Sequence, residues 1–407
     1  MSFSDIRYIL ASDTLLASFI PLIILVIGYK HFSFNVSNLR DLLSVGYRKR
    51  PVYGYFSLPR AYFSFDQYAQ LSARELSKMR ASYRKLGRAN EKIGFKIGYP
   101  KKLDRLQEEI ANNATITAGI TSLALDEFPS LKTNVDAPID PNSADLGRVR
   151  ESLKHYVRDW SSEGKPERAR IFAPILKLLQ KVPANSRQDL KVLVPGCGLG
   201  RLAWEISELG FDTTANELSY FMILALRFLC SEKTTKSVNQ HNLAPYAHWF
   251  SHQLTNESLF RQISFPDVLP RFSSNFHLAE GDFLELKAPL SHTSHLKGYD
   301  FIITLFFIDT SLDVLATLNH IYNLLKPGGT WVNLGPLLWT GGGQAKLELS
   351  LEEVLLAVEE IGFILNAGKT GAGSRKTIEC EYTGDKNAMM RWIYKAEFWV
   401  ATKPQSL

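Results

Sequence analysis

The stretch that decides the fold is KVLVPGCGLGRL, residues 191–202, where an apolar run leads into a glycine-rich loop. Lys191–Pro195 is short and rich in valine, which is typical of a strand buried on both faces. Three glycines follow at alternate positions, and apolar spacing predicts a helix over Leu202–Leu209. Glycine lets a backbone turn sharply and approach a ligand without a Cβ in the way. A strand, a glycine turn and a helix predict one unit of a parallel sheet, although such turns also close purely structural units.

The same alternation of short apolar runs and helical stretches continues toward the C-terminus. We expect further strands at Phe211–Asn216, Phe276–Glu280, Tyr299–Phe307, Thr330–Leu334 and, in an aromatic run, Arg391–Thr402. We expect helices at Tyr220–Cys230, Leu312–Leu325 and Leu351–Ile361. This order predicts a doubly wound α/β sheet with right-handed crossovers and helices on both faces.

The part of the chain before the glycine loop has a different texture. Residues 61–185 repeat apolar positions at helical spacing, which predicts a helical region, whereas residues 1–60 have no clear fold signal. We therefore expect an irregular N-terminus (1–60), a helical region (61–185) and an α/β domain (186–407). Within that domain, the segment 231–275 is expected to be an insertion that caps the sheet.

The net charge of +6 is mild, but basic residues gather between Arg48 and Arg105. Such a region can meet nucleic acid or anionic lipid, yet a solvated helix surface explains it as well. We favour the solvated surface and expect no nucleic-acid partner.

Cysteine and histidine usage argues against a disulfide framework and against a metal site. Cys197, Cys230 and Cys380 are odd in number and widely spaced, which favours a reducing compartment. The histidines lack consistent metal-ligand spacing, so we expect no metal and interpret the clustered ones as surface or insertion residues. These are His241, His248, His252, His292 and His295.

Thr14–Tyr29 carries no charge and is mostly apolar. A membrane-spanning helix needs about 20 such residues, whereas this segment has 16 and contains Pro21. A secretory signal is disfavoured because no basic region precedes it: Asp5 and Arg7 cancel. Membrane contact through residues 14–29 stays an alternative to the cytoplasmic location that we favour.

Glu217 follows the second expected strand, 17 residues after Gly200. In a doubly wound sheet, ligands bind at the carboxyl ends of the strands, where a carboxylate can accept hydrogen bonds from both hydroxyls of a ribose. The alternative is that Glu217 caps the helix that follows. Together with the glycine loop, Glu217 favours a ligand that contains a nucleoside.

Two cofactor types share this geometry, and the glycine spacing separates them. Dinucleotide sites use G-x-G-x-x-G to hold a pyrophosphate, whereas here the spacing is G-x-G-x-G and Arg201 stands at the third-glycine position. The turn LLKPGGT, residues 324–330, resembles the turn before the fifth strand of class I methyltransferases. Asp282 and Phe283, after the third strand, suit an adenine amino group and ring. The sequence therefore predicts S-adenosylmethionine rather than a nicotinamide cofactor.

The chain resembles one narrower group, the carnosine N-methyltransferase (N2227-like) family. The motifs that resemble it are PGCGLGRLAWEI (195–206), Asn216-Glu217, Gly281-Asp282-Phe283, FFIDT (306–310), NLGPLL (333–338), VRDWS (157–161) and Met389-Met390. The likeness covers about residues 145–403. It implies a class I (Rossmann-like) methyltransferase that moves a methyl group from S-adenosylmethionine to an imidazole nitrogen, making anserine from carnosine. It also implies a cytoplasmic location, extending to the nucleus, and raises a homodimer as one assembly.

The resemblance also implies which residues hold the cofactor. They are Arg158, Gly196, Glu217, Asp282 and Phe283, with two further positions, His155 and Leu305, where the family has Gln and Cys. The guanidinium of Arg158 can pair with the methionine carboxylate.

Asp309 and Tyr394 are the expected substrate contacts. Asp309 can accept a hydrogen bond from the N–H of one imidazole nitrogen, which leaves the other nitrogen nucleophilic and stabilises the imidazolium as it forms. The alternative is that Asp309 caps the helix beginning near Thr310. Tyr394 matches a family substrate tyrosine, although a buried tyrosine in a strand is unremarkable.

One departure from the family bears on the acceptor. Thr340 stands where the family has a histidine, and three glycines follow it. Three hypotheses stay open: methylation of a histidine-containing dipeptide or a protein histidine, a non-catalytic scaffold that binds S-adenosylmethionine, and a nicotinamide oxidoreductase. The glycine spacing disfavours the last.

Overall fold

The computed structural model describes residues 53–133, 144–290, 297–339, 344–365 and 374–405. They belong to a compact unit that runs from Tyr53 to Leu407 and contains both the expected helical region and the expected α/β domain. Residues 14–29, His292, His295 and Thr340 lie outside the described ranges. In the described part of the chain, no helix has the length and apolar character needed to cross a membrane.

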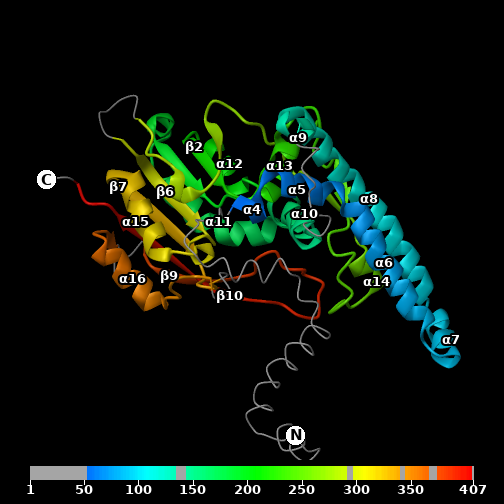
Figure 1. Ribbon diagram of the computed structural model, residues 1–407. Helices are drawn as coiled ribbons and strands as arrows, with labels where there is room; N and C mark the ends of the chain where they lie inside the picture. The colour runs from blue at the N-terminus through cyan, green and yellow to red at the C-terminus, as the bar shows by residue number, and fades with distance from the viewer. Residues whose placement is uncertain (1–52, 134–143, 291–296, 340–343, 366–373, 406–407) are drawn as a thin grey trace, which may run out of the picture. The chain divides into compact units, whose positions relative to one another are not determined.

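The centre of the fold is an eight-stranded sheet with the order β5-β2-β1-β6-β7-β10-β8, in which β9 pairs with β10 (Figure 1). The strands are β1 (Lys191–Pro195), β2 (Asp212–Glu217), β5 (Phe276–Glu280), β6 (Tyr299–Leu305), β7 (Leu325–Gly335), β8 (Ile364–Leu365), β9 (Lys376–Cys380) and β10 (Tyr394–Thr402). The first five in the order are parallel, and β10 runs antiparallel to β7, β8 and β9. The strand order reverses at β1, which confirms the predicted doubly wound fold and puts the glycine loop at the switch point.

Helices cover the sheet as the alternation predicts. Those of the α/β part are α11 (Lys165–Leu179), α12 (Arg201–Glu208), α13 (Tyr220–Cys230), α15 (Val314–Leu324) and α16 (Leu351–Glu360). The short 3-10 turns are η3 (Ala184–Asp189), η4 (Phe283–Glu285) and η5 (Ile308–Thr310). Strand β6 is shorter than the expected strand Tyr299–Phe307. It ends at Leu305 because Phe306 adopts a left-handed conformation, with φ of 51°. The chain therefore turns away from the strand direction just before Asp309.

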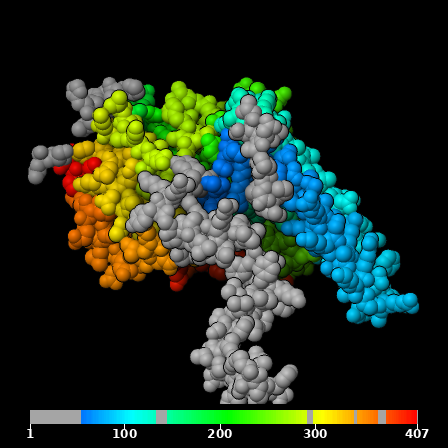
Figure 2. Space-filling model, in the orientation of Figure 1, coloured from blue at the N-terminus to red at the C-terminus, as the bar shows by residue number. Residues whose placement is uncertain are grey.

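The helical region packs against α13. Its elements are α4 (Tyr53–Phe56), α5 (Leu58–Asp66), α6 (Tyr68–Arg84), α7 (Arg88–Lys96), α8 (Tyr99–Glu127), α9 (Ser130–Thr133) and α10 (Leu146–Trp160). Phe65, Ile120 and Trp160 share a buried core with Phe221 of α13. The far ends of α6 and α8, with α7, stand away from the sheet (Figure 1, Figure 2).

The segment 231–275 packs on these helices, whereas we expected a cap over the sheet. It contains a small sheet of two strands, β3 (His241–Leu243) and β4 (Ile263–Phe265), with α14 (Asn256–Leu259) between the strands in the chain. Strand β3 contacts α8, and β4 contacts α10. The physical reason is that the apolar side chains of β3 and β4 enter the same core as Trp160. The side-chain amide of Asn113 reinforces this contact by pairing with both the N–H and the C=O of Ala244.

Two of the clustered histidines, His241 and His248, lie in the segment 231–275 and are half-buried, which agrees with the expectation of surface or insertion residues. His248 lies between Tyr68 and Arg150, with ring nitrogens 2.9 Å from the hydroxyl and 3.0 Å from the guanidinium. Burial, then Arg150, lowers the pKa of His248 to about 3. His241 packs against Phe228. In the described residues, no group of these side chains is arranged to hold a metal ion.

A tight corner between α10 and α11 sets the position of Arg158. A Cβ added at Gly164 would lie 2.6 Å from the Cα of Arg158 and closer still to the carbonyl oxygens of Val157 and Arg158. The guanidinium of Arg168 donates to the carbonyl oxygens of Arg158 and Ser161, at 2.5 and 2.8 Å. The end of α10 is therefore held firmly beside the glycine loop.

We predict that Gly164→Ala destabilises the fold by about 2–3 kcal/mol, because the added methyl group meets backbone atoms that cannot move aside. Chemical denaturation followed by circular dichroism measures this free energy of unfolding. Gly54→Ala is the control: no atom lies within 4 Å of its added Cβ, so its unfolding free energy should stay within about 0.5 kcal/mol of the starting protein. Equal stability of the two variants would contradict the close packing of the corner.

Candidate active site

The glycine loop between β1 and α12 uses left-handed backbone at all three glycines. Gly196, Gly198 and Gly200 have φ of 61°, 57° and 74°. A Cβ on Gly196 would lie 2.5 Å from the ring of Phe307. The loop is held from outside by the indole N–H of Trp160, which donates to the carbonyl oxygen of Leu199 at 2.8 Å. The backbone is thus fixed in a form that leaves its inner side free of Cβ atoms.

Glu217 ends β2 and fastens that strand to the loop. One carboxylate oxygen accepts from the N–H of Gly198 at 2.9 Å, and the other accepts from the N–H of Ser219 at 2.8 Å. Burial raises the pKa of Glu217, and these N–H groups partly offset the shift. Each oxygen keeps a second lone pair, so the group can still accept a hydrogen bond from a ligand hydroxyl. Glu217 also contributes to capping α13, as the alternative interpretation expected, because it accepts the N–H of Ser219 at the start of that helix.

Asp282 and Phe283 follow β5 on the neighbouring strand end. The carboxylate of Asp282 accepts from the N–H of Leu284 at 2.9 Å and so begins the turn η4. The buried ring of Phe283 meets Phe307 edge-on at 5.3 Å and His320 at 5.0 Å. Because Phe307 also contacts Gly196, this aromatic group joins the ends of β1, β5 and β6 into one side of the site.

Arg158 approaches the loop from α10. It forms a two-pronged ion pair with Asp159, at 2.7 and 2.8 Å, while its Nη1 is buried with no hydrogen-bond partner among the described residues. Its Nη2 lies 3.9 Å from where a Cβ on Gly198 would stand. Burial opposes the charges, but each partner stabilises the other: the pKa of Arg158 is raised and that of Asp159 is lowered.

His155 lies one turn earlier on α10. Burial, then the charge of Arg158, lowers the pKa of His155, which favours a neutral ring. Its buried Nδ1 has no hydrogen-bond partner in the described structure. Nη1 of Arg158, with its two N–H donors, and Nδ1 of His155, which lies 3.9 Å from Oδ2 of Asp159, are polar groups at that end of the loop that a ligand can satisfy.

Tyr382, which the sequence did not single out, links the region around Arg158 to Phe306 and Tyr394. Tyr382 stacks on Phe306 with ring centres 4.3 Å apart and lies 4.2 Å from the guanidinium of Arg158. Tyr394 then meets Phe306 edge-on at 5.6 Å. Tyr382 stands in an irregular segment with no periodicity and no motif of its own, so nothing local pointed to it.

Asp309 sits in η5, directly after the left-handed turn at Phe306. Its carboxylate is 5% exposed and accepts from the N–H of Leu338 at 2.9 Å. Burial raises the pKa of Asp309 to about 6. Burial, then the charge of Asp309, raises the pKa of Tyr394, so the two side chains are electrostatic neighbours. The cap of the following helix is Asp313, whose carboxylate accepts from Ala316 N, and not Asp309.

Leu305, the last residue of β6, pairs with Leu334 of β7 and is only partly buried. The predicted site residues thus fall into two groups: the glycine loop with His155, Arg158, Glu217, Asp282 and Phe283, and Asp309 with Tyr394. Phe306 and Tyr382 connect the second group to Arg158 in the first.

The raised pKa of Asp309 predicts a specific pH dependence of stability. A folded-state pKa near 6, above the ordinary 3.8, means that the folded state holds a proton that the unfolded state releases more readily. Stability is therefore lost as pH rises through about 6, and Asp309→Asn escapes that loss. Urea unfolding should show the variant gaining about 1 kcal/mol over the starting protein between pH 5 and pH 7.

Asp313→Asn is the control for this titration. Hydrogen bonding to Lys346, first, and to Ala316 N lowers the pKa of Asp313, so its removal should not stabilise the protein at pH 7. A stability difference between Asp309→Asn and the starting protein that is the same at both pH values would refute the shifted pKa.

Comparison with known proteins places this site in a family. A sequence profile described as "Carnosine N-methyltransferase" matches residues 135–405. The chain is 36% identical over 322 residues to the carnosine N-methyltransferase of Mus musculus, covering 75% of this chain and 76% of the mouse protein. It is 32% identical over 376 residues to that of Schizosaccharomyces pombe, covering 85% and 94%.

Among solved structures, the chain is similar to phosphoethanolamine N-methyltransferase 2 of Haemonchus contortus in complex with S-adenosyl-L-methionine. The identity is 15% and the TM-score 0.37, with 65% of this chain and 59% of that one covered. The sequence matches decide the assignment, because the family profile spans more than half of the chain and includes both groups of site residues. The chain belongs to the carnosine N-methyltransferase family.

Proposed function

We propose that this protein transfers a methyl group from S-adenosylmethionine to an imidazole ring nitrogen of carnosine or a related histidine-containing dipeptide. The observation behind the proposal is the buried carboxylate of Asp309 beside Tyr394, joined through Phe306 and Tyr382 to the glycine-loop site. Membership in the carnosine N-methyltransferase family supports the same substrate class.

The residues around the loop fit the methyl donor. Glu217 retains lone pairs for the two ribose hydroxyls, and Asp282 can accept from the adenine amino group beside Phe283. The unpartnered Nη1 of Arg158 suits the donor's carboxylate, since a buried guanidinium N–H without an acceptor is costly. When bound, S-adenosylmethionine supplies a methyl group on a positively charged sulfonium and leaves as a neutral thioether. The remaining work is to position the nucleophile in line with that methyl group.

Asp309 orients the acceptor and stabilises its charge. A carboxylate oxygen accepts the N–H of one imidazole nitrogen, which fixes the tautomer and exposes the lone pair of the other. As that nitrogen gains the methyl group, the ring becomes an imidazolium, and the buried carboxylate faces the new positive charge. Leu338 N holds the Asp309 carboxylate in place, so it is oriented before the substrate arrives.

The aromatic residues complete the acceptor side. Phe306, Tyr382 and Tyr394 present ring faces and edges, which bind a flat imidazole and attract the cation that forms from it. These partly buried rings lower the local polarity and so strengthen the interaction between Asp309 and the imidazolium. The cysteines Cys197, Cys230 and Cys380 are all free, which supports a reducing compartment such as the cytoplasm.

Two measurements test the proposal directly. Calorimetry compares S-adenosylhomocysteine with NADH, and we expect binding of the first alone. Incubation with methyl-labelled cofactor and carnosine, and separately with a pool of histidine-bearing peptides, then shows which acceptor is labelled. Label in the peptides but not in carnosine would move the acceptor to protein histidine. Binding without label in either acceptor would leave a non-catalytic scaffold.

Asp309→Asn should lower kcat by about 100- to 1,000-fold, because an amide cannot carry the charge that stabilises the imidazolium. Its affinity for S-adenosylhomocysteine should be unchanged, since Asp309 lies on the acceptor side. Methylation assays and calorimetry on the same preparation separate the two effects. Asp313→Asn, at a nearby helix cap, serves as the matched control and should keep near-normal turnover. Unchanged turnover in Asp309→Asn would remove the assigned role.

Glu217→Ala should weaken S-adenosylhomocysteine binding about 10- to 100-fold, because two ribose hydroxyls lose their acceptor and the loop loses its tie to β2. Isothermal titration calorimetry gives the dissociation constant directly. Glu208→Ala, at the exposed end of α12, is the comparison variant and should bind normally. If both variants bind equally well, Glu217 is not a cofactor residue.

A further inference from the structure

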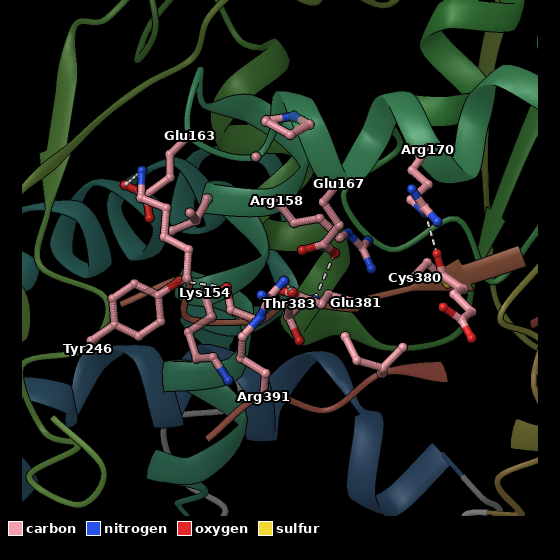
Figure 3. Close-up of a pocket in the computed structure, with 17 residues that line it drawn as sticks. Lys154, Arg158, Glu163, Glu167, Arg170, Tyr246, Cys380, Glu381, Thr383 and Arg391 are labelled. Carbon is pink, nitrogen blue, oxygen red and sulfur yellow. Dashed lines mark hydrogen bonds and ion pairs between the residues drawn. The ribbon is translucent and has the colours of Figure 1, made fainter. Parts of the chain in front are cut away.

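A cavity of about 520 Å³ lies where the corner between α10 and α11 meets the segment that follows β9 (Figure 3). Arg158 lines it, so the cavity borders the group that we assign to the donor's carboxylate. Several carboxylates also line it, and two of them are neutralised by contacting cations: Glu163 by Arg261 and Lys386, and Glu381 by Arg391.

Glu167, in the first turn of α11, is a third carboxylate of this cavity and has different partners. Its Oε1 accepts from the backbone N–H of Thr383 at 2.8 Å, and the backbone of Gly384 is close enough to act on its charge. Figure 3 shows this carboxylate directed at the turn that contains Thr383. The described ion pairs do not include Glu167, although the charge of Arg158 acts on its carboxylate, and its hydrogen bond is to the backbone of that turn.

We propose that Glu167 is a positioning residue for methyl transfer: it anchors the turn at Thr383 and Gly384, and thereby holds Tyr382 between Arg158 and Phe306. The inference rests on the proposed function only in assigning Arg158 to the donor. The hydrogen bond from which it is argued joins two residues of this chain and does not depend on any ligand.

The turn at Thr383 needs such an anchor. Thr383 is β-branched and has φ of 52°, in the left-handed region that such residues rarely adopt. A conformation of this kind persists only when the surroundings enforce it. The carboxylate of Glu167 does so from outside the turn, because it accepts the N–H of Thr383 itself.

The anchored turn fixes a ring with contacts on both sides. The Tyr382 ring lies 4.2 Å from the Arg158 guanidinium, 4.3 Å from the ring of Phe306 and edge-on to His155 at 6.0 Å. Glu167 is itself fixed relative to Arg158, because α10 and α11 pack closely against one another at Gly164. The carboxylate therefore sets the distance between the hairpin that carries Tyr382 and the helix that carries Arg158.

The test uses Glu167→Ala with Glu379→Ala as the matched control, because Glu379 is an exposed carboxylate lining the same cavity. Hydrogen exchange should show that the amides of Thr383 and Gly384 lose protection in Glu167→Ala and keep it in Glu379→Ala. Calorimetry should show S-adenosylhomocysteine binding about tenfold weaker in Glu167→Ala, the equivalent of one lost buried hydrogen bond, and unchanged in the control.

A double-mutant cycle with Tyr382→Ala separates positioning from general stability. If Glu167 acts through Tyr382, the double variant binds S-adenosylhomocysteine no more weakly than Tyr382→Ala alone. Additive losses would overturn the proposal, as would unchanged binding in Glu167→Ala. Should Glu167→Ala fail to fold, Glu167→Gln takes its place: an amide oxygen accepts the N–H of Thr383 more weakly than a carboxylate does, so a smaller loss is expected and no loss refutes the proposal.

The outcomes also distinguish this inference from the proposed function. If the starting protein binds S-adenosylhomocysteine but labels no imidazole, the proposed acceptor fails while the cycle on binding still reports on Glu167. If the starting protein binds S-adenosylhomocysteine and turns over carnosine, but the cycle is additive, only the role of Glu167 falls.

Discussion

The hydrogen bond from the N–H of Gly198 to the carboxylate of Glu217 closes the loop on which the site is built. It joins the ends of β1 and β2, which are neighbours in the sheet, and it orients the carboxylate that we assign to the ribose. The left-handed glycines make the bond geometrically accessible, because any other residue there would be strained. The loop is also braced by Trp160 and by the ring of Phe307, so α10 and β6 both depend on its shape.

From that loop a continuous set of contacts reaches the acceptor side. Arg158 stands beside Gly198, Tyr382 packs on Arg158, Phe306 packs on Tyr382, and Tyr394 packs on Phe306. Left-handed backbone occurs at Phe306 and next to Tyr382, at Thr383. Strain of this kind collects at functional sites, where the surrounding structure enforces a geometry that the chain alone would avoid. Here the enforcing contacts come from β7, through Leu334 and Gly335, and from α11, through Glu167.

The electrostatics of the two halves differ in a way that suits their roles. Arg158 and Asp159 neutralise one another in the core, which leaves the buried Nη1 of Arg158, with its two N–H donors, for an incoming anion. Asp309 has no cation beside it among the described ion pairs, and burial raises its pKa to about 6. In the role that we propose for Asp309, a positively charged ring that forms against the carboxylate offsets the cost of its burial.

The sequence by itself determined most of the strands and helices, and it predicted the residues of the glycine-loop site. The period of apolar residues is a local property, and so are the loop at Gly196, the carboxylate at Glu217 and the pair Asp282-Phe283, each of which follows a strand directly. Resemblance to the family added Arg158, Asp309 and Tyr394 on the strength of motifs. The strands β8 and β9 escaped prediction because they are short and exposed, with little apolar pattern.

Only the tertiary structure decided where the segment 231–275 packs, that Phe306 turns out of β6, and that Tyr382 lies against Arg158. Each of these depends on surfaces that meet from distant parts of the chain: β3 and β4 on α8 and α10, Phe306 under Gly335, and the hairpin after β9 on α11. No local period encodes such contacts, since they are selected by the burial of apolar area and the satisfaction of buried polar groups in the folded chain. Glu167 is the plainest case: in the sequence it is an ordinary acidic residue in the first turn of a helix, and only the fold brings the backbone N–H of Thr383 to its carboxylate.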